Sequence, residues 1–354
     1  MNELEQGNTG GGYMGKKLNL LVRKMPSESK EGVYKQDVSP QRCPPTFLGI
    51  GSMRCGSTWL YEVLRCHPDI RLTNPKEIGF FFSTPRTMLR HDLNWYEKHF
   101  EPPDGDNPKP VRGEIAPEYT RLKAWQVNRI ANLLPDLRIV LTVRHPIDRI
   151  WSQALVDLGY LRGRDIRKIS SLDFVREIER AHNQQFSDYY HAIKVWSKAF
   201  GQDSLHIGLF DQLRNDPQTF INGILGHIGA ATPWALPEKF VMTKVHPTNR
   251  LVRHNREIPE AVQWYIADRW LKSTERLNEL LDGRVSPWID EMRAIRGRTR
   301  LSWRILRELN RTVLSVPERL AYETYHAALD VRLRWRWRQL KKAYRSNDSA
   351  CVAY

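Results

Sequence analysis

The segment from Phe47 to Leu60 constrains the fold of this chain more than any other stretch of its 354 residues. It reads FLGIGSMRCGSTWL: an apolar run ends at glycine, an arginine and a second glycine follow, and two hydroxyl residues open a new apolar run. This order is typical of a buried strand, a glycine-containing loop and the first turn of a helix. Because backbone N–H groups at a helix N-terminus bind anions well, the segment predicts a phosphate-binding loop.

The loop differs from the phosphate loop of nucleoside triphosphatases. The stretch from Gly51 to Thr58 lacks the GxxxxGK[ST] spacing of that class, and no magnesium partner for Ser57 or Thr58 is evident. Short glycine motifs are weakly specific, so a plain strand–helix turn with a surface arginine is an alternative for the loop taken alone. A second segment is needed to decide between the two interpretations.

That second segment begins with the apolar, β-branched run at 137–143, which is typical of a buried parallel strand. Arg144 ends the run, a proline opens the next helix, and Ser152 lies two turns further on. Since ligands of parallel α/β sheets bind at the carboxyl ends of the strands, Arg144 and Ser152 are predicted to hold a second phosphate. In the alternative interpretation, Asp148 and Arg149 form an exposed pair and Ser152 is an ordinary helix residue.

Strands and helices alternate along the middle of the chain. Helical spacing of apolar residues marks the segments between the strands, and from about 256 onward only helices are predicted. This order predicts an α/β fold with a central parallel sheet flanked by helices. The predicted strands lie near 46–50, 70–72, 113–119, 137–143 and 205–210, and the helices near 57–65, 86–100, 125–134, 147–158, 172–182, 187–200 and 217–229.

The length of the chain fits one large domain with extensions. We predict a flexible leader at 1–43, where glycine, lysine and serine are frequent, a main domain at 44–290 and a basic helical extension at 291–354. The net charge of +15 indicates an anionic partner. A nucleotide, an acidic polymer, nucleic acid and a membrane surface would each satisfy this charge, so it does not choose among them.

The four cysteines form no CxxC pair and no metal-ligand spacing, so we expect reduced thiols and no metal. No run reaches the roughly 20 apolar residues that a membrane-spanning helix needs. The first residues also lack an apolar stretch of signal-peptide length. Together these observations lead us to expect a cytoplasmic protein.

The two loops resemble those of sulfotransferases that use 3′-phosphoadenosine 5′-phosphosulfate. The resemblance spans roughly residues 46–250 and is shared by many bacterial sulfotransferases. It implies a P-loop-like, nucleotide-binding sulfotransferase fold, and it extends to four further motifs that are similar to the heparan-sulfate type: KEIGFF at 76–81, NWY at 94–96, EIAPEY at 114–119 and SDYY at 187–190.

The resemblance implies catalytic roles for two residues. Glu77 corresponds to the carboxylate proposed as general base, which removes the proton of the acceptor hydroxyl. The alternative for Glu77 is a plain ion pair with Lys76. Arg54 departs from the family pattern, because many members carry lysine there. Arginine keeps the charge but donates a proton poorly, so we expect electrostatic stabilisation of the departing phosphate.

The resemblance also implies which residues bind the donor. These are Arg54, Cys55, Gly56, Ser57 and Thr58 at the 5′-phosphosulfate, Arg144 and Ser152 at the 3′-phosphate, and Lys244 and Arg250 in a late loop over the adenosine.

The function implied is the transfer of a sulfuryl group from 3′-phosphoadenosine 5′-phosphosulfate to a hydroxyl or amine, without a metal, and the expected acceptor is a carbohydrate or glycolipid. Two rivals stay open. A P-loop-type kinase would carry a full Walker loop with lysine and an acidic magnesium ligand, and neither is visible. A non-catalytic nucleic-acid binder would bind through the basic tail in a salt-sensitive manner, independently of Arg54 and Arg144.

The tail alternates basic residues with two tryptophans between Arg332 and Arg338. As a helix, it would suit peripheral contact with a membrane surface or an acidic polymer. A solvated terminal helix is an equal alternative. We expect no specific nucleic-acid partner.

Overall fold

The computed structural model describes residues 43–82, 91–102, 109–242 and 257–309, together with ten positions between 320 and 338. The described residues from Cys43 onward form one compact unit. Residues 1–42 of the leader predicted at 1–43 lie outside the described residues, as do Lys244 and Arg250, whereas Cys43 is buried in the core. The ten later positions are 320, 323, 324, 327, 330, 331, 334, 335, 337 and 338.

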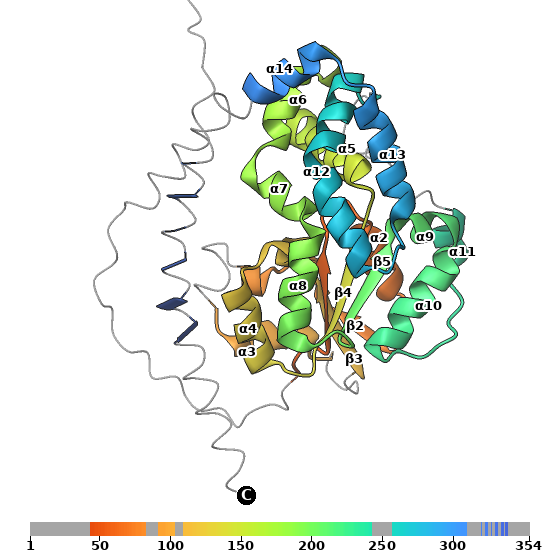
Figure 1. Cartoon of the computed structure of the whole chain (residues 1–354). Helices are drawn as coiled ribbons and strands as arrows, with labels where there is room; N and C mark the ends of the chain where they lie inside the picture. Colours follow the sequence, from red (N-terminus) through yellow and green to blue (C-terminus); the bar gives the residue numbers. More distant parts are fainter. Residues whose placement is uncertain are drawn as a thin grey trace, which may run out of the picture. The chain divides into compact units, whose positions relative to one another are not determined.

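A five-stranded parallel sheet forms the centre of this unit (Figure 1). The strand order is β2-β3-β1-β4-β5, so β1 lies in the middle and the chain crosses to either side of it. The predicted α/β fold with a parallel sheet flanked by helices is therefore confirmed. The strands are β1 (Phe47–Gly51), β2 (Ile70–Leu72), β3 (Val111–Ile115), β4 (Arg138–Val143) and β5 (Leu205–Leu209).

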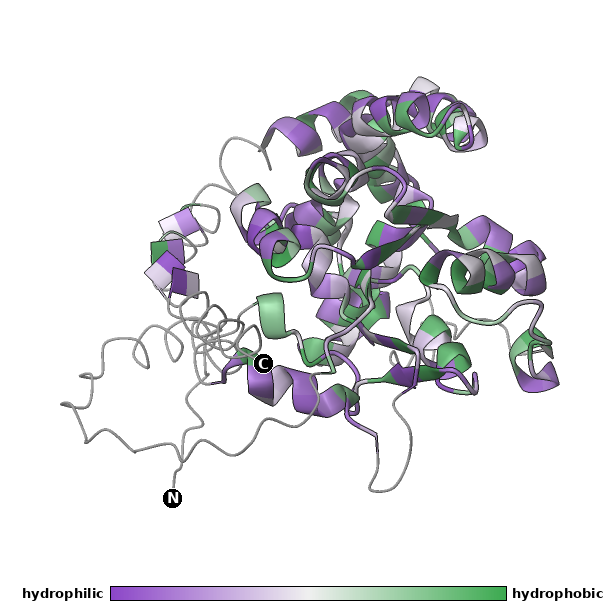
Figure 2. Ribbon diagram, turned by 90° about the horizontal axis from the view of Figure 1, so that it is seen from below, coloured by the Kyte–Doolittle hydropathy of each residue, from purple (hydrophilic) through white to green (hydrophobic). Residues whose placement is uncertain are grey.

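Helices cover both faces of the sheet, which explains why the central strand β1 is apolar along its whole length. Leu48 and Ile50 face a core that α4 (Ala124–Leu133) and α8 (Tyr189–Phe200) complete. Phe47 faces the opposite core, which α2 (Ser57–Leu64) and α10 (Pro217–Ile228) cover. Figure 2 shows hydrophobic residues along the strands and hydrophilic residues on the outer sides of the helices.

A third apolar cluster lies among helices beyond the sheet. It joins α5 (Pro146–Leu155) and α6 (Ser171–Ile178) to two helices from the last third of the chain. These are α12 (Glu260–Leu280) and α13 (Ser286–Gly297), and α13 contains the predicted domain boundary at residue 290. The boundaries at 43 and 290 stay predictions.

The remaining helices are α3 (Leu93–Glu97), α7 (Ala181–Ser187), α9 (Phe210–Asn215), α11 (Glu238–Met242) and α14 (Leu301–Leu309).

Two predicted helix boundaries differ from the structure. Residues 171–200 form three helices instead of two, because the helix predicted at 172–182 ends at Ile178 and α7 begins at Ala181. Asp188 separates α7 from α8, and its side chain accepts a hydrogen bond from the backbone N–H of His191. The helix expected at 86–100 contains α3 and a 3₁₀ turn at Lys98–Phe100, and residues 83–90 lie outside the described part.

The described residues of the tail pack against α4 and the Phe80–Phe82 turn. Trp337 is buried and stacks on Phe81, with ring centroids 6.1 Å apart. The Arg334 guanidinium lies 4.8 Å from the ring centre of Trp125. Trp335, in contrast, is 60% exposed. The two tail tryptophans therefore differ in exposure, and the expectation of a freely solvated terminal helix does not hold for Trp337.

Over its described residues the chain contains no helix that is long and apolar enough to cross a membrane.

Candidate active site

The loop between β1 and α2 turns sharply through residues with left-handed backbone angles. Gly51, Arg54 and Gly56 have φ of 127°, 67° and 89°. Gly56 lies directly before α2, and a Cβ atom there would approach Leu213 to 2.9 Å. The turn leaves Ser57 and Thr58 in the first turn of α2, where Thr58 is exposed. The predicted strand, loop and helix N-terminus are all present in this order.

Cys55 is the member of this loop that points into the protein. It is fully buried, and its Sγ lies 3.5 Å from the Tyr189 hydroxyl. Burial raises the pKa of the Cys55 thiol. A protonated, inaccessible thiol is a packing group, so any contact of Cys55 with the donor would come from its backbone N–H.

The two predicted phosphate loops meet at the carboxyl ends of β1 and β4. Arg54 Nε donates a hydrogen bond to Ser152 Oγ at 3.0 Å, and Arg144 Nη1 donates to the Arg54 carbonyl oxygen at 3.3 Å. The Arg144 guanidinium also lies 4.6 Å from the ring centre of Phe210 and 3.5 Å from the Asp148 carboxylate. Three of the residues singled out from the sequence thus form one contact group, although they are up to 98 positions apart.

Arg149 is a third arginine at this site, and sequence reasoning missed it. It is fully buried, so the alternative of an exposed Asp148–Arg149 pair is wrong, and Asp148 pairs with Arg144 instead. Its Nη2 donates to the carbonyl oxygen of Asn183 at 3.1 Å. We call Arg54, Arg144 and Arg149 the arginine cluster. The signal was present in the sequence, because Arg149 precedes Ser152 by three positions on one helix and so shares its face.

The arginine cluster holds more positive charge than its surroundings balance. Burial lowers the pKa of Arg149, and burial together with the charge of Arg144 lowers the pKa of Arg54. Three buried guanidinium nitrogens have no hydrogen-bond partner in the described part of the chain: Arg144 Nε, Arg149 Nε and Arg149 Nη1. Unpaired buried donors are costly, so this arrangement favours an anion. A phosphate or sulfate group fits both the charge and the donors.

Replacing Arg149 with methionine is expected either to leave the free energy of unfolding of the unliganded protein unchanged or to raise it by about 1–4 kcal/mol. The change removes a poorly compensated buried charge, and the Asn183 carbonyl keeps its hydrogen bond from Ser187 Oγ at 3.2 Å. Thermal unfolding of both proteins without ligand measures the effect. A Tm several degrees lower in the variant would mean that the guanidinium is well compensated in the folded state.

Tyr189 fixes the chain where β4 ends. Its hydroxyl donates to the Arg144 carbonyl oxygen at 3.0 Å and accepts from the Arg144 backbone N–H at 3.4 Å. The same hydroxyl contacts Cys55 Sγ, so one buried side chain of α8 links both phosphate loops. Tyr189 is part of the SDYY motif, but neither its burial nor these partners follow from the motif.

The Glu77 segment is anchored by a second carboxylate, Glu114 in β3. Glu114 is fully buried, and its Oε1 accepts from the Gly79 backbone N–H at 2.5 Å. Its Oε2 accepts from the hydroxyls of Tyr96 and Tyr119, each at 2.7 Å. Burial raises the pKa of Glu114, while these donors oppose the rise. Glu114 therefore positions the turn that carries Glu77.

Glu77 itself is partly exposed, with φ of 63°, and pairs with Lys76. Burial lowers the pKa of Lys76 to about 8, although the charges of Glu118 and Glu114 act in the opposite direction. No hydrogen bond or ion pair between described residues joins Glu77 to Arg54, Arg144 or Ser152. The role of Glu77 as base stays a prediction, as do the roles of Lys244 and Arg250, which lie outside the described residues.

Comparison with known proteins finds a similarity for this arrangement. Residues 108–234, which include Glu114, Arg144, Arg149, Ser152 and Tyr189, match the model described as "Sulfotransferase family". Over this stretch, which is about a third of the chain, the protein is similar to sulfotransferases. The loop at 51–58 lies outside the matched residues and is tied to them by the contacts of Arg54 with Ser152 and Arg144.

Two relatives illustrate the range of the similarity. A membrane-associated sulfotransferase, kil1 of Dictyostelium discoideum, is 31% identical over 120 residues, which are 34% of this chain and 24% of that protein. The match thus covers about a quarter of the length of this relative. The crystal structure of a sulfotransferase from Alicyclobacillus acidocaldarius superposes with a TM-score of 0.54 at 22% identity and covers 69% of this chain and 98% of that one. The latter supports the fold.

Proposed function

We propose that this chain is a sulfotransferase, which transfers a sulfuryl group from 3′-phosphoadenosine 5′-phosphosulfate to an acceptor hydroxyl or amine. The observation that carries the proposal is the arginine cluster at the meeting point of the β1 and β4 loops, with buried guanidinium nitrogens that have no hydrogen-bond partner among the described residues. The donor presents a phosphosulfate at one end and a 3′-phosphate on its ribose. Two adjacent loops, each with an arginine and a hydroxyl residue, suit two such anionic groups.

Each of the site residues has a separate role in this proposal. Arg144, Arg149 and Ser152 bind the 3′-phosphate, and the backbone N–H groups of residues 54–58 bind the phosphosulfate. When bound, the donor supplies an activated sulfuryl group, whose sulfur forms a bond to the acceptor oxygen as its bond to the 5′-phosphate oxygen breaks. Arg54 stabilises the negative charge that develops on this phosphate. Glu77 takes the proton that the acceptor loses.

A carbohydrate or glycolipid acceptor and a cytoplasmic location with peripheral membrane contact belong to the same proposal. The kil1 protein is named as membrane-associated. In the tail of this chain, Leu320, Val331 and Trp335 are 58%, 70% and 60% exposed and lie close to Arg334 and Arg338 in sequence. Exposed apolar and basic residues together favour an interface with anionic lipid headgroups.

Calorimetric titration with adenosine 3′,5′-bisphosphate, the product of the donor, tests the proposal. ATP with magnesium serves as the comparison, because a kinase-like phosphate loop would prefer it. Tight binding of the bisphosphate that EDTA does not weaken, with weak binding of ATP, is expected. Preference for ATP and magnesium would contradict the proposed function and favour a phosphotransferase.

A further inference from the structure

A cavity of about 600 Å³ lies beside α7, outside the arginine cluster. Its walls come from the end of α6, from α7, α12 and α14, and from Glu323 in the tail. None of the residues that line it was singled out from the sequence. They are Glu179, Ala181, Gln184, Gln185, Tyr265, Asp268, Arg269, Arg307 and Glu323.

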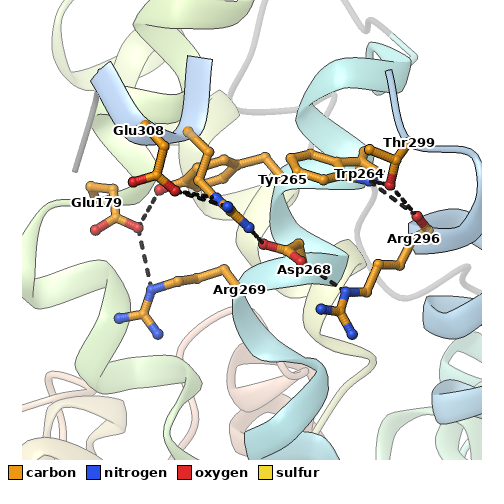
Figure 3. Close-up of polar contacts among 9 residues, drawn as sticks. Glu179, Trp264, Tyr265, Asp268, Arg269, Arg296, Thr299 and Glu308 are labelled. Atoms are coloured by element: carbon orange, nitrogen blue, oxygen red, sulfur yellow. Dashed lines mark hydrogen bonds and ion pairs between the residues drawn. The ribbon is translucent and has the colours of Figure 1, made fainter. Parts of the chain in front are cut away.

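One side of the cavity is held by Glu179. Its Oε1 accepts a hydrogen bond from the Tyr265 hydroxyl at 2.6 Å and lies 3.5 Å from Arg269 Nε (Figure 3). Arg269 Nη2 also donates to Gln184 Oε1 at 2.9 Å. These contacts fix the side chains of α12 and α7 relative to each other. A ligand would therefore meet polar groups that are already ordered, which lowers the entropic cost of binding.

The opposite side is built on Asp268, one turn along α12. Its two carboxylate oxygens accept from Arg296 Nε at 2.8 Å and from Arg307 Nη1 at 2.7 Å. Figure 3 shows Asp268 beside Arg296, with Tyr265 on the neighbouring turn. A guanidinium has five N–H donors and a carboxylate about four acceptor positions, so both keep hydrogen-bonding capacity beyond these contacts.

The cavity adjoins the candidate active site through α7. Gln185 lines the cavity, and its Oε1 accepts from Arg121 Nε at 3.0 Å. The Arg121 guanidinium lies 4.9 Å from the ring centre of Phe82, which ends the segment that carries Glu77. At the carboxyl end of α7, the Phe186 carbonyl oxygen accepts from Ser52 Oγ in the β1 loop at 2.7 Å.

The chemistry of the lining selects among ligand classes. Three carboxylates outnumber two guanidinium groups, so an anionic ligand would meet net repulsion. Ala181 is the lining residue without a polar side-chain group, so an apolar ligand would leave many polar groups without hydrogen bonds. A neutral polyhydroxyl ligand supplies donors and acceptors together, and the guanidinium and carboxylate groups of the lining can pair with both. Gln184 Nε2 already donates to the carbonyl and carboxylate oxygens of Glu179, so Gln184 would offer the ligand an acceptor, its Oε1.

From this we propose that the cavity binds a neutral sugar unit of the acceptor, at a distance from the hydroxyl that reacts. The proposal rests on the proposed function, because it assigns part of the same acceptor to a second site. Binding of a sugar unit here would hold the acceptor while the reacting hydroxyl reaches Glu77. The cavity then contributes to the choice of acceptor without contacting the donor.

Saturation-transfer NMR with the full chain tests this site without requiring turnover. The neutral probes are trehalose, lactose and cellobiose, and glucuronic acid and 4-nitrophenol represent the anionic and apolar classes. At least one neutral disaccharide is expected to bind. Arg269→Ala should weaken this binding about tenfold, as the loss of one hydrogen bond to a charged group predicts. Gln184→Leu, independently, should weaken it about fivefold, as the loss of a hydrogen bond between neutral groups predicts.

Arg293→Ala is the matched control. Arg293 pairs with Glu275 at 2.8 Å on the exposed surface and does not line the cavity, so sugar binding should be unchanged. Adenosine 3′,5′-bisphosphate affinity, measured on the same samples, verifies folding and tests the proposed function separately. If Arg269→Ala lowers the Tm, its loss of sugar binding could come from misfolding, and the sugar binding of Gln184→Leu is then the measurement that tests the proposal. The proposal is overturned if no neutral disaccharide binds or if both variants bind the disaccharide normally. It is also overturned if Gln184→Leu abolishes the signal of glucuronic acid or 4-nitrophenol and leaves that of the neutral disaccharides unchanged.

Discussion

The Glu77→Gln variant is expected to lose about 10²–10⁴-fold in kcat while binding adenosine 3′,5′-bisphosphate as tightly as the parent protein. Glutamine keeps the shape of the side chain but cannot accept the proton of the acceptor. The Gly79 N–H to Glu114 hydrogen bond that anchors the segment does not involve residue 77, so the fold should be retained. Turnover with a sulfated product as readout, and calorimetry with the bisphosphate, separate the two effects.

Two controls distinguish a base from a partner of Lys76. Glu62→Gln removes a carboxylate of similar exposure that pairs with Arg65 on α2, and it should leave kcat unchanged. Lys76→Met breaks the ion pair from the other side. If Lys76→Met reproduces the whole loss, the carboxylate acts through the lysine. Near-normal turnover of Glu77→Gln would remove Glu77 from the mechanism altogether.

The second large effect is expected for Arg144→Ala, which should weaken bisphosphate binding roughly 10–100-fold. This is the magnitude of about 1.5–3 kcal/mol that a hydrogen bond to a charged group contributes. The variant also removes the support that Arg144 Nη1 gives to the Arg54 carbonyl oxygen. Calorimetry at two salt concentrations measures the loss, and the salt dependence of the affinity should decrease with it.

Arg167→Ala is the appropriate comparison, because Arg167 is an exposed arginine of the basic loop that pairs with Asp165 at 2.9 Å. It removes the same net charge from a position outside the candidate site. Bisphosphate affinity should stay within twofold or so of the parent protein, since exposed ion pairs contribute little. Equal affinities of Arg144→Ala and the parent protein would refute the assignment of Arg144 to a phosphate.

The fold could be predicted from the sequence because its main features are local. A strand buried on both faces is mostly apolar, and the runs at 46–50 and 137–143 show this without any knowledge of their neighbours. The arginines that end these runs could be paired for the same reason, since parallel strands end at one edge of the sheet. The break between α6 and α7 was not predicted, because Glu179 and Arg180, which lie at this break, are neither proline nor glycine and look like ordinary polar helix residues.

The supporting residues of the site could not be found in this way. Arg149 and Glu114 are charged and were expected at the surface or left without a role, yet both are fully buried. Their burial depends on α7 and on the turn at Phe80–Phe82, which come from distant parts of the sequence. Tertiary packing decides whether a charged residue is a surface group or a buried anchor, and a single sequence does not contain that information.

The stacking of Trp337 on Phe81 also has a consequence for how the molecule is made. Phe81 follows the turn that Glu114 anchors, whereas Trp337 lies 256 positions later in the chain. Until the ribosome has added Trp337, this side of the turn lacks its aromatic neighbour. The segment with Glu77 therefore reaches its final packing only after residue 337 has been synthesised. Shortened products that end before the tail would carry the phosphate loops beside an incompletely covered Glu77 turn.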